Sequence, residues 1–419
     1  MSDFCCGAQR DVQCRFCCRK ATEMPRVSKM HKAKNEKNNE FYTMFSDIER
    51  EMNAYLDYNP DVFKDKTILL PCDDPEWSNF TKYFAQNFER FGLKKLISTS
   101  YAADSKPNDI PYQLTLFEVN SPKYDKKKTR SHGKIFILER DINKDKKINI
   151  NDLEWNYLKG DGDFRSLEIK KLRDEADIII TNPPFSLFKE FFAWIMESKK
   201  QFAFIINKAS ISNKDVFPFF MNQLVWSGKE DWKGGMWFET FSESDDYDKT
   251  IDGKKYKNVA AIWITNIDHG RRHKPIPLMT MEENIRYSKY SEIRGKEYQK
   301  YDNYDAIEVP YTSAIPRDYT GLMGVPITFL EKFCPEQFEI IGATQRGCHK
   351  NVPELKTYEE YKEINYKTGK PTGSSGSKTN GNGNLPGIKE KNNYFLNEKT
   401  GEIVHSTFSR IFIKAKEQP

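Results

Sequence analysis

Residues 182–185 read Asn-Pro-Pro-Phe, and their types could hold and activate a planar amine. The side-chain carbonyl of Asn182 and the backbone carbonyl of Pro183 can accept the two protons of one NH2 group. These bonds would draw the nitrogen lone pair out of a conjugated ring such as adenine and make the nitrogen a better nucleophile. Pro183 and Pro184 would keep the acceptors in place, and Phe185 could stack on the ring. A Pro-rich turn in which Asn182 only forms the bend is the alternative.

The residues that follow an apolar run at 67–72 could bind a methyl donor. The sequence there continues with Asp73, Asp74 and Pro75, so the GxGxxG fingerprint of a pyrophosphate site is absent. S-adenosylmethionine has no pyrophosphate, and a carboxylate can meet its cationic methionine end. Asp73 and Asp74 are both candidates for this contact, and capping of the next helix is the alternative for Asp74.

Two further stretches could surround the adenine ring of such a donor. In the turn at 160–164, Asp163 could accept a hydrogen bond from the adenine amine, and Phe164 could stack on the ring. Residues 39–43 offer another aromatic wall, for which an ordinary buried aromatic pair is the alternative.

These stretches must be held by alternating strands and helices. Short apolar runs are typical of buried parallel strands, and apolar residues at helical spacing are typical of helices packed on a sheet. The pattern predicts an α/β fold with a parallel, doubly wound sheet, in which ligands bind at the carboxyl ends of strands. The expected strands are 67–72, 93–101, 177–181 and 202–206, and the expected helices are 46–55, 80–91 and 187–196.

The later part of the chain is less regular. Residues 235–238 and 259–264 read as an antiparallel pair at the far edge of the sheet. Beyond residue 267 the sequence is rich in Tyr, Lys and Arg, with little periodicity. Residues 367–387 are rich in Gly, Ser and Asn and predict a flexible loop, whereas 406–414 alternates like a strand.

The composition is that of a soluble globular protein. Apolar residues make up 38% and charged residues 30% of the 419 positions, and this length predicts two modules. No apolar stretch reaches the roughly 20 residues that span a bilayer. The N-terminus also lacks the apolar region of a secretory signal, so the cytoplasm is the expected location.

Cysteine use argues against disulfides and against a metal site. Five of the eight cysteines lie within the first 18 residues, which is no disulfide framework for the body of the protein. Cys14 and Cys17 have metal-ligand spacing, but no second Cys or His pair follows at a zinc-site interval. Residues 1–38 are polar and basic and predict a disordered tail, or a true start at Met24 or Met30.

Charge is a weak guide to partners, since the net charge is only +5 against 66 Lys and Arg residues. The positions at which Lys and Arg residues cluster are more informative about a polyanionic partner. Basic clusters occur at 126–130 and at 271–274, where a solvated loop competes with phosphate binding as the interpretation.

The motifs together resemble a known family. The chain is similar to the amino-methyltransferases with a (D/N/S)PP(Y/F/W) motif and, within them, to the EcoRI-type adenine-specific DNA methyltransferases. The stretches DDP-x-x-SNF-x-KYF and GVPITFL-x-K are more specific than the Asn-Pro-Pro-Phe loop, and the block order resembles the gamma arrangement. The resemblance rests on residues 39–52, 68–101, 162–166, 177–191, 324–342 and 409–413.

The resemblance implies a Rossmann-like, mostly parallel catalytic domain at 39–267 and a DNA target-recognition region at 268–419, which includes the loop 367–387. It implies S-adenosylmethionine as the methyl donor. It does not decide whether Asp73 or Asp74 makes the contact with the cationic end of that donor. The donor contacts that the family motifs imply are Phe41, Thr43, Asp73, Asp163, Phe164 and Asn182.

The implied reaction is methylation at N6 of an adenine rotated out of duplex DNA. Restriction–modification, or modification in a phage or its bacterial host, is the implied setting. Arg271, Arg272 and Lys274 become candidates for phosphate contacts, and a monomer is expected, with a dimer as the alternative.

Other functions fit part of this pattern. An Asn-Pro-Pro-aromatic loop could serve an RNA or a protein-glutamine methyltransferase, because it suits any planar amine of similar geometry. A catalytically silent DNA-binding module is a rival of another class, and the intact loop at 182–185 argues against it.

Overall fold

The structure, a computed structural model, describes residues 41–73, 78–102, 121–240, 247–344 and 351–416. The tail predicted at 1–38 lies outside these ranges together with Cys14 and Cys17, and so does Asp74. The backbone of Phe41 is described, but its side chain is not. Within the described ranges, no helix is long and apolar enough to cross a membrane. No group of three or more His, Cys, Asp or Glu side chains in those ranges could hold a metal ion.

The largest sheet in the described part of the chain has eight strands. They are β2 (Thr67–Leu70), β3 (Lys95–Ser100), β4 (Lys134–Leu138), β5 (Glu154–Tyr157), β6 (Ile178–Thr181), β7 (Gln201–Asn207), β8 (Trp226–Ser227) and β12 (Ala261–Thr265). Their order across the sheet is β5-β4-β3-β2-β6-β7-β12-β8. Strand β6, which directly precedes the Asn-Pro-Pro-Phe stretch, therefore lies near the middle of the sheet.

The sheet is mixed, which corrects the expectation of a mostly parallel sheet. Strands β3, β2, β6 and β7 are parallel to one another, whereas β4, β5, β12 and β8 pair antiparallel to their neighbours. Parallel neighbours need a long crossover connection, usually a helix. No α-helix lies between β4 and β5, where residues 139–153 are fully described. The predicted α/β class is confirmed, and the sheet has parallel strands in its centre and antiparallel strands on both sides of them.

Apolar side chains fill both faces of the central strands. Successive residues of a strand point to opposite faces, so Leu69 and Ile179 join one apolar cluster while Ile68 and Ile178 join the other. Helix residues complete each cluster, which explains why these strands are apolar at every position. The first cluster takes in α8 (Leu167–Glu175), α9 (Phe188–Ser198) and α10 (Phe217–Met221), and the second α3 (Phe45–Tyr58), α4 (Asn79–Gln86) and α5 (Phe88–Phe91).

A smaller sheet corrects the predicted pairing of 235–238 with 259–264. Its strands are β1 (Phe41–Thr43), β9 (Met236–Thr240), β10 (Lys249–Ile251) and β11 (Lys254–Val259), in the order β1-β9-β11-β10. The run 259–264 divides at Ala260: Val259 pairs with Met236, whereas β12 begins at Ala261 and pairs with β7 in the large sheet.

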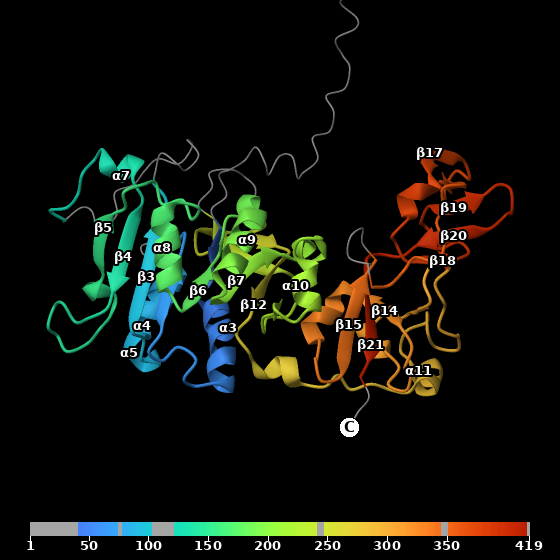
Figure 1. Ribbon diagram of the computed structural model, residues 1–419, viewed down its shortest axis with the longest axis horizontal. Coiled ribbons are helices and arrows are strands. Elements are labelled where there is room, and N and C mark those ends of the chain that lie inside the picture. Colours follow the sequence, from blue (N-terminus) through green and yellow to red (C-terminus); the bar gives the residue numbers. More distant parts are fainter. Residues whose placement is uncertain (1–40, 74–77, 103–120, 241–246, 345–350, 417–419) are drawn as a thin grey trace, which may run out of the picture.

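The C-terminal region forms two more sheets, at the other end of the molecule from β5 (Figure 1). The first has the order β13-β14-β21-β15 and contains β13 (Ile307–Glu308), β14 (Met323–Pro326), β15 (Phe338–Ala343) and β21 (Arg410–Ala415). The second has the order β17-β16-β19-β20-β18 and contains β16 (Tyr361–Ile364), β17 (Pro371–Ser375), β18 (Asn384–Pro386), β19 (Tyr394–Asn397) and β20 (Ile403–Ser406). Helix α11 (Met281–Tyr287) precedes both sheets in the chain.

Two expectations for this region are corrected. Residues 367–387 are not a flexible loop, because they form β17, β18 and the 3-10 turn Gly376–Thr379 between them. The run 406–414 is not one strand, because Ser406 ends β20 and β21 begins at Arg410. One apolar cluster runs from Phe204 and Val225 to Met323 and Ile413, so the core continues across the predicted boundary at residue 268.

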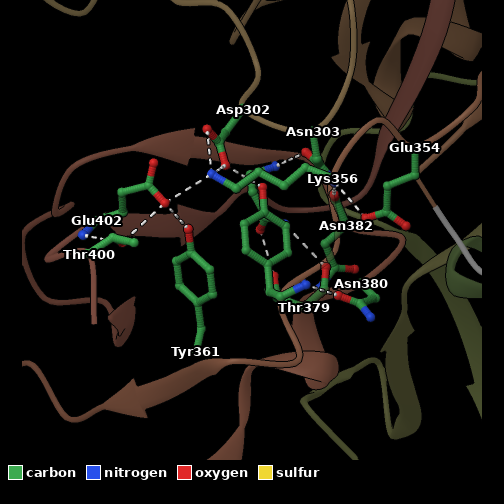
Figure 2. A network of polar contacts seen from close by, with 12 residues as sticks. Asp302, Asn303, Glu354, Lys356, Tyr361, Thr379, Asn380, Asn382, Thr400 and Glu402 are labelled. Atoms are coloured by element: carbon green, nitrogen blue, oxygen red, sulfur yellow. Dashed lines mark hydrogen bonds and ion pairs between the residues drawn. The ribbon is translucent and has the colours of Figure 1, made fainter. Parts of the chain in front are cut away.

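A polar network joins the five-stranded sheet to the segment before β13 (Figure 2). The buried Asn303 donates from Nδ2 to Glu354 Oε1 at 2.8 Å and to the carbonyl of Asn382 at 2.8 Å. The carboxylate of Asp302 accepts from the Tyr358 hydroxyl at 2.7 Å and pairs with Lys356 Nζ at 3.1 Å. A movement of the five-stranded sheet away from the segment before β13 would break these hydrogen bonds. Because a buried polar group without a partner costs free energy, the network holds the sheet in one orientation.

Candidate active site

The Asn-Pro-Pro-Phe loop leaves the carboxyl end of β6 and enters a short 3-10 turn, η3 (Phe185–Leu187), before α9. Asn182 is half-buried, Pro183 is buried and Pro184 is exposed. The amide of Leu187 donates to the carbonyl of Pro184 at 3.0 Å, which closes the turn. The loop thus lies over the parallel centre of the sheet, where this class of fold binds its ligands.

Asp73 connects the ends of three strands. Its side chain is 5% exposed and accepts from the hydroxyls of Ser78 at 2.7 Å and Thr181 at 2.6 Å. Its backbone amide donates to the carbonyl of Thr99 at the end of β3 at 2.8 Å. Because Thr181 directly precedes Asn182, this carboxylate fixes the start of the Asn-Pro-Pro-Phe loop. Sequence reasoning identified Asp73 but missed Thr181 and Ser78.

Ser78 has a second role, as the N-cap of helix α4. The helix begins at Asn79, and the hydroxyl of Ser78 accepts from the amide of Phe80 at 3.1 Å as its N-cap. Ser78 therefore performs the capping role that was the alternative for Asp74. The signal was a serine directly before an apolar helical pattern.

Cys72 supplies the backbone bend that a glycine usually provides in such a loop. Its φ is +72°, in the left-handed region that residues with a Cβ seldom adopt. The bend turns the chain from β2 back toward the sheet edge, so that Asp73 meets the end of β3. The chain therefore makes this turn although the sequence has no glycine there.

The loop at 160–164 packs tightly against the end of β3. Ala102 donates from its amide to the carbonyl of Asp161 at 2.8 Å. Gly162 has a φ of +88°, and a Cβ there would lie 2.4 Å from the carbonyl oxygen of Ser100. A Cβ on Gly133 would lie 2.5 Å from the same oxygen. Both glycines therefore serve this close backbone contact.

Asp163 is already bound on two sides. Its carboxylate accepts from Nε of Arg165 at 2.9 Å and from the hydroxyl of Tyr101, at the end of β3. The hydrogen bond from Arg165 is the main cause that lowers the pKa of Asp163, so the group is a carboxylate at neutral pH. Burial, followed by the bond to Asp163, raises the pKa of Tyr101, so that residue is a neutral donor. Tyr101 was missed as a site residue.

Phe164 is buried in the apolar cluster that contains helix α9. Its side chain is 0% exposed and makes edge-to-face contacts with Phe191 at 5.2 Å and Trp194 at 5.7 Å between ring centroids. The guanidinium of Arg165, a largely exposed side chain, lies 5.5 Å from the centroid of the same ring, so the expected stacking role stays a prediction. The ring anchors the loop that carries Asp163.

Strand β1 pairs with β9, and β9 contacts the Asn-Pro-Pro-Phe loop. Thr43 is directly opposite Phe238 in the antiparallel pair, and Phe238 contacts Phe185 edge-to-face at 6.3 Å between ring centroids. The Thr43 side chain is 3% exposed, and its hydroxyl has no hydrogen-bond partner among the described residues. The carbonyl of Thr43 accepts from Asn79 Nδ2 at 2.8 Å, which ties β1 to α4.

The basic cluster after β12 is largely engaged within the protein. Arg271 donates to Asp231 at 3.0 Å and to Glu331 at 2.9 Å. The guanidinium of Arg272 lies 3.9 Å from the ring centroid of Trp226. These contacts fix the segment after β12 to its neighbours, and the phosphate contacts expected of Arg271 and Arg272 stay a prediction. Lys274 is exposed.

Comparison with known proteins identifies relatives over most of the chain. The family model described as "Adenine-specific methyltransferase EcoRI" matches residues 29–416. "Type II methyltransferase M.EcoRI" of Escherichia coli is 39% identical over 319 residues, which cover 74% of this chain and 88% of that protein. "Type II methyltransferase M.MpnI" of Mycoplasma pneumoniae is 34% identical over 318 residues, 74% of this chain and 84% of the relative.

A third relative, "Type II methyltransferase M.MgeORF184P" of Mycoplasma genitalium, is 34% identical over 321 residues, 74% of this chain and 84% of its own length. No solved structure matches the chain significantly.

Proposed function

Because this chain belongs to the family of EcoRI-type adenine-specific methyltransferases, we propose that the loop at 182–185 holds the N6 amine of a target adenine during methyl transfer. The family makes the protein a DNA adenine methyltransferase of restriction–modification. It also removes the RNA, protein-glutamine and non-catalytic alternatives. The observation that carries the residue assignment is the position of Asn182, one residue beyond the Thr181 hydroxyl that Asp73 holds.

The proposed mechanism uses acceptors rather than a base. The Asn182 side-chain carbonyl and the Pro183 backbone carbonyl accept hydrogen bonds from the two N6–H groups and favour a tetrahedral nitrogen. Phe185, braced by Phe238, stacks on the flipped adenine. As the new N–C bond forms, the nitrogen becomes cationic, and the two carbonyl oxygens stabilise that charge until a proton leaves to water.

S-adenosylmethionine is the donor that the residues fit. When bound, it would supply an electrophilic methyl group, whose bond to the sulfonium sulfur breaks as the bond to N6 forms, with S-adenosylhomocysteine as the leaving group. Asp73 offers a buried carboxylate at the end of β2 beside the catalytic loop. Asp163 offers a second carboxylate at the end of β3. The buried hydroxyl of Thr43 needs a partner that the described residues do not provide. Phe41 and Asp74, which the resemblance also implies, remain proposals.

Replacing Thr43 by valine tests the donor site, because it should raise the stability of the free protein and lower its affinity for the donor. A buried hydroxyl without a partner costs about 1–3 kcal/mol, so Thr43→Val should stabilise the free protein by roughly 1 kcal/mol. If S-adenosylmethionine satisfies that hydroxyl, the same change should weaken donor binding by about fivefold to tenfold. Urea unfolding and isothermal titration with S-adenosylmethionine measure the two effects.

The matched control is Thr250→Val on the exposed strand β10 of the same sheet. It should leave donor affinity at the wild-type value. Unchanged donor affinity in Thr43→Val would remove Thr43 from the proposed donor site.

The proposed DNA partner is a duplex, with sequence recognition in the C-terminal region at 268–416. The five-stranded sheet presents its edge strand β17, whose Pro371, Thr372, Gly373 and Ser375 are exposed. The network around Asn303 and Asp302 holds that sheet in one orientation (Figure 2), as a module that reads base edges requires.

A further inference from the structure

We infer that a rigid basic patch around helix α7 (Lys128–Ser131) binds the phosphates of the DNA duplex beside the target adenine; this rests on the proposed function. The patch consists of Lys126, Lys127, Lys128 and Arg130, all of which are exposed.

The charge of this segment is strongly one-sided. Residues 121–134 contain six Lys and Arg residues and one carboxylate, that of Asp125. Asp125 Oδ1 accepts from the backbone amides of Lys127 at 2.9 Å and Lys128 at 3.1 Å, so it holds the turn. A dense row of exposed ammonium groups is the chemistry that a polyphosphate backbone attracts.

The patch is fixed to the large sheet. The Thr129 side chain is 2% exposed, and its hydroxyl lies 2.5 Å from the hydroxyl of Tyr157 on β5. Lys123 Nζ donates to the carbonyl of Trp155 at 3.1 Å, and Gly133 donates from its amide to the carbonyl of Gly160 at 2.9 Å. Because the backbone is anchored at both ends of the helix, the lysines are presented in a defined place, and less entropy is lost on binding.

The position of the patch matches the catalytic edge. Lys134 at the start of β4 pairs with Ser100 at the end of β3, so α7 lies at the carboxyl edge of the parallel strands. Figure 1 shows α7 at one end of this edge and the five-stranded sheet at the other, with β6 between them. A duplex that reaches both would pass over Asn182.

The strand spacing gives an estimate of the register. Strand β4 is three strands from β6, which corresponds to roughly 14 Å at a spacing of about 4.8 Å. At about 3.4 Å per base pair, the patch should meet phosphates roughly four base pairs from the flipped adenine. This side of the target is opposite to the side covered by the C-terminal region.

The variant K126Q/K127Q/K128Q tests the inference in the full-length protein with a duplex that the wild type methylates. Each lost phosphate contact removes about 0.9 from the slope of log affinity against log salt, so the slope should fall by about 2 to 3. At roughly 0.1 M salt the Kd for DNA should rise by at least about tenfold. Fluorescence anisotropy over a salt series measures both quantities, and K126R/K127R/K128R should restore them.

The matched control is K144Q/K146Q/K147Q, which removes the same charge from the β4–β5 connection at the opposite edge of the sheet. It should keep the wild-type Kd and salt slope. An unchanged slope in K126Q/K127Q/K128Q, or an equal fall in the control, would overturn the inference. Failure of the proposed function is distinguishable, because the wild type itself would then not methylate the duplex.

Discussion

Asn182→Ala should reduce the turnover number for methyl transfer by roughly a thousandfold, because it removes an acceptor that acts on the transition state. In the proposed mechanism the side-chain carbonyl of Asn182 holds one of the two N6 protons and stabilises the positive charge on the nitrogen. The side chain is half-buried at the end of β6, and alanine fits the same backbone. Single-turnover assays with excess enzyme and labelled donor measure the methyl-transfer step itself.

The same variant should bind DNA and S-adenosylmethionine within a few-fold of the wild type and unfold at a similar urea concentration. Asn182→Asp is the informative companion, because a carboxylate oxygen can still accept a hydrogen bond from the amine; this variant should retain more activity than Asn182→Ala. Turnover of Asn182→Ala within about tenfold of the wild type would exclude a direct role for this side chain, because a transition-state contact contributes several kcal/mol.

Gly162→Ala should destroy the donor site by pushing two backbone segments apart. The new Cβ would lie 2.4 Å from the carbonyl oxygen of Ser100, at a φ of +88°. The combined backbone strain and steric clash should cost about 3 kcal/mol or more of unfolding free energy. Because the same loop holds Asp163 against Tyr101, affinity for S-adenosylmethionine should fall by more than about tenfold, even in molecules that remain folded.

Gly160→Ala is a matched control in the same loop. A Cβ on Gly160 meets nothing within 4 Å, so this variant should keep wild-type stability and donor affinity. Equal behaviour of the two alanine variants, in unfolding and in donor titration, would mean that the close contact with β3 has no role in the site.

The strands that precede the candidate site residues could be predicted from the sequence, because they depend on short contiguous stretches. The apolar run before Asn182 is the buried strand β6, the run at 67–72 contains β2, and the run at 202–206 lies within β7. Asp73 lies at the end of its strand, as expected. The family assignment drew on the same stretches and is confirmed by the match over residues 29–416.

The pairing of distant strands could not be predicted in the same way. The segment around Val259 has one apolar pattern, but Ala260 divides it between two sheets, and only long-range packing decides that division. The Gly- and Ser-rich segment 367–387 looked like a flexible loop, yet β17 and β18 pair within the five-stranded sheet. Its small residues permit turns, and the neighbouring strands β16 and β20 supply the hydrogen bonds.

Several site residues depended on contacts that composition does not reveal. Phe164 stood beside Asp163 in the sequence, but its ring points into the core toward Phe191 and Trp194. Arg271 formed part of a basic run, but Asp231 and Glu331 engage it in the folded chain. Exposure and partner charges decide such roles, and they follow from the fold.

The most direct test of the central claim is the identity of the methylated nucleoside. The purified protein is incubated with duplex DNA and S-adenosylmethionine that carries an isotope-labelled methyl group, and the DNA is digested and analysed by mass spectrometry. The account predicts that the label appears in N6-methyldeoxyadenosine, and that Asn182→Ala loses the signal while still binding the duplex. Label on cytosine, or equal labelling by Asn182→Ala, would contradict it.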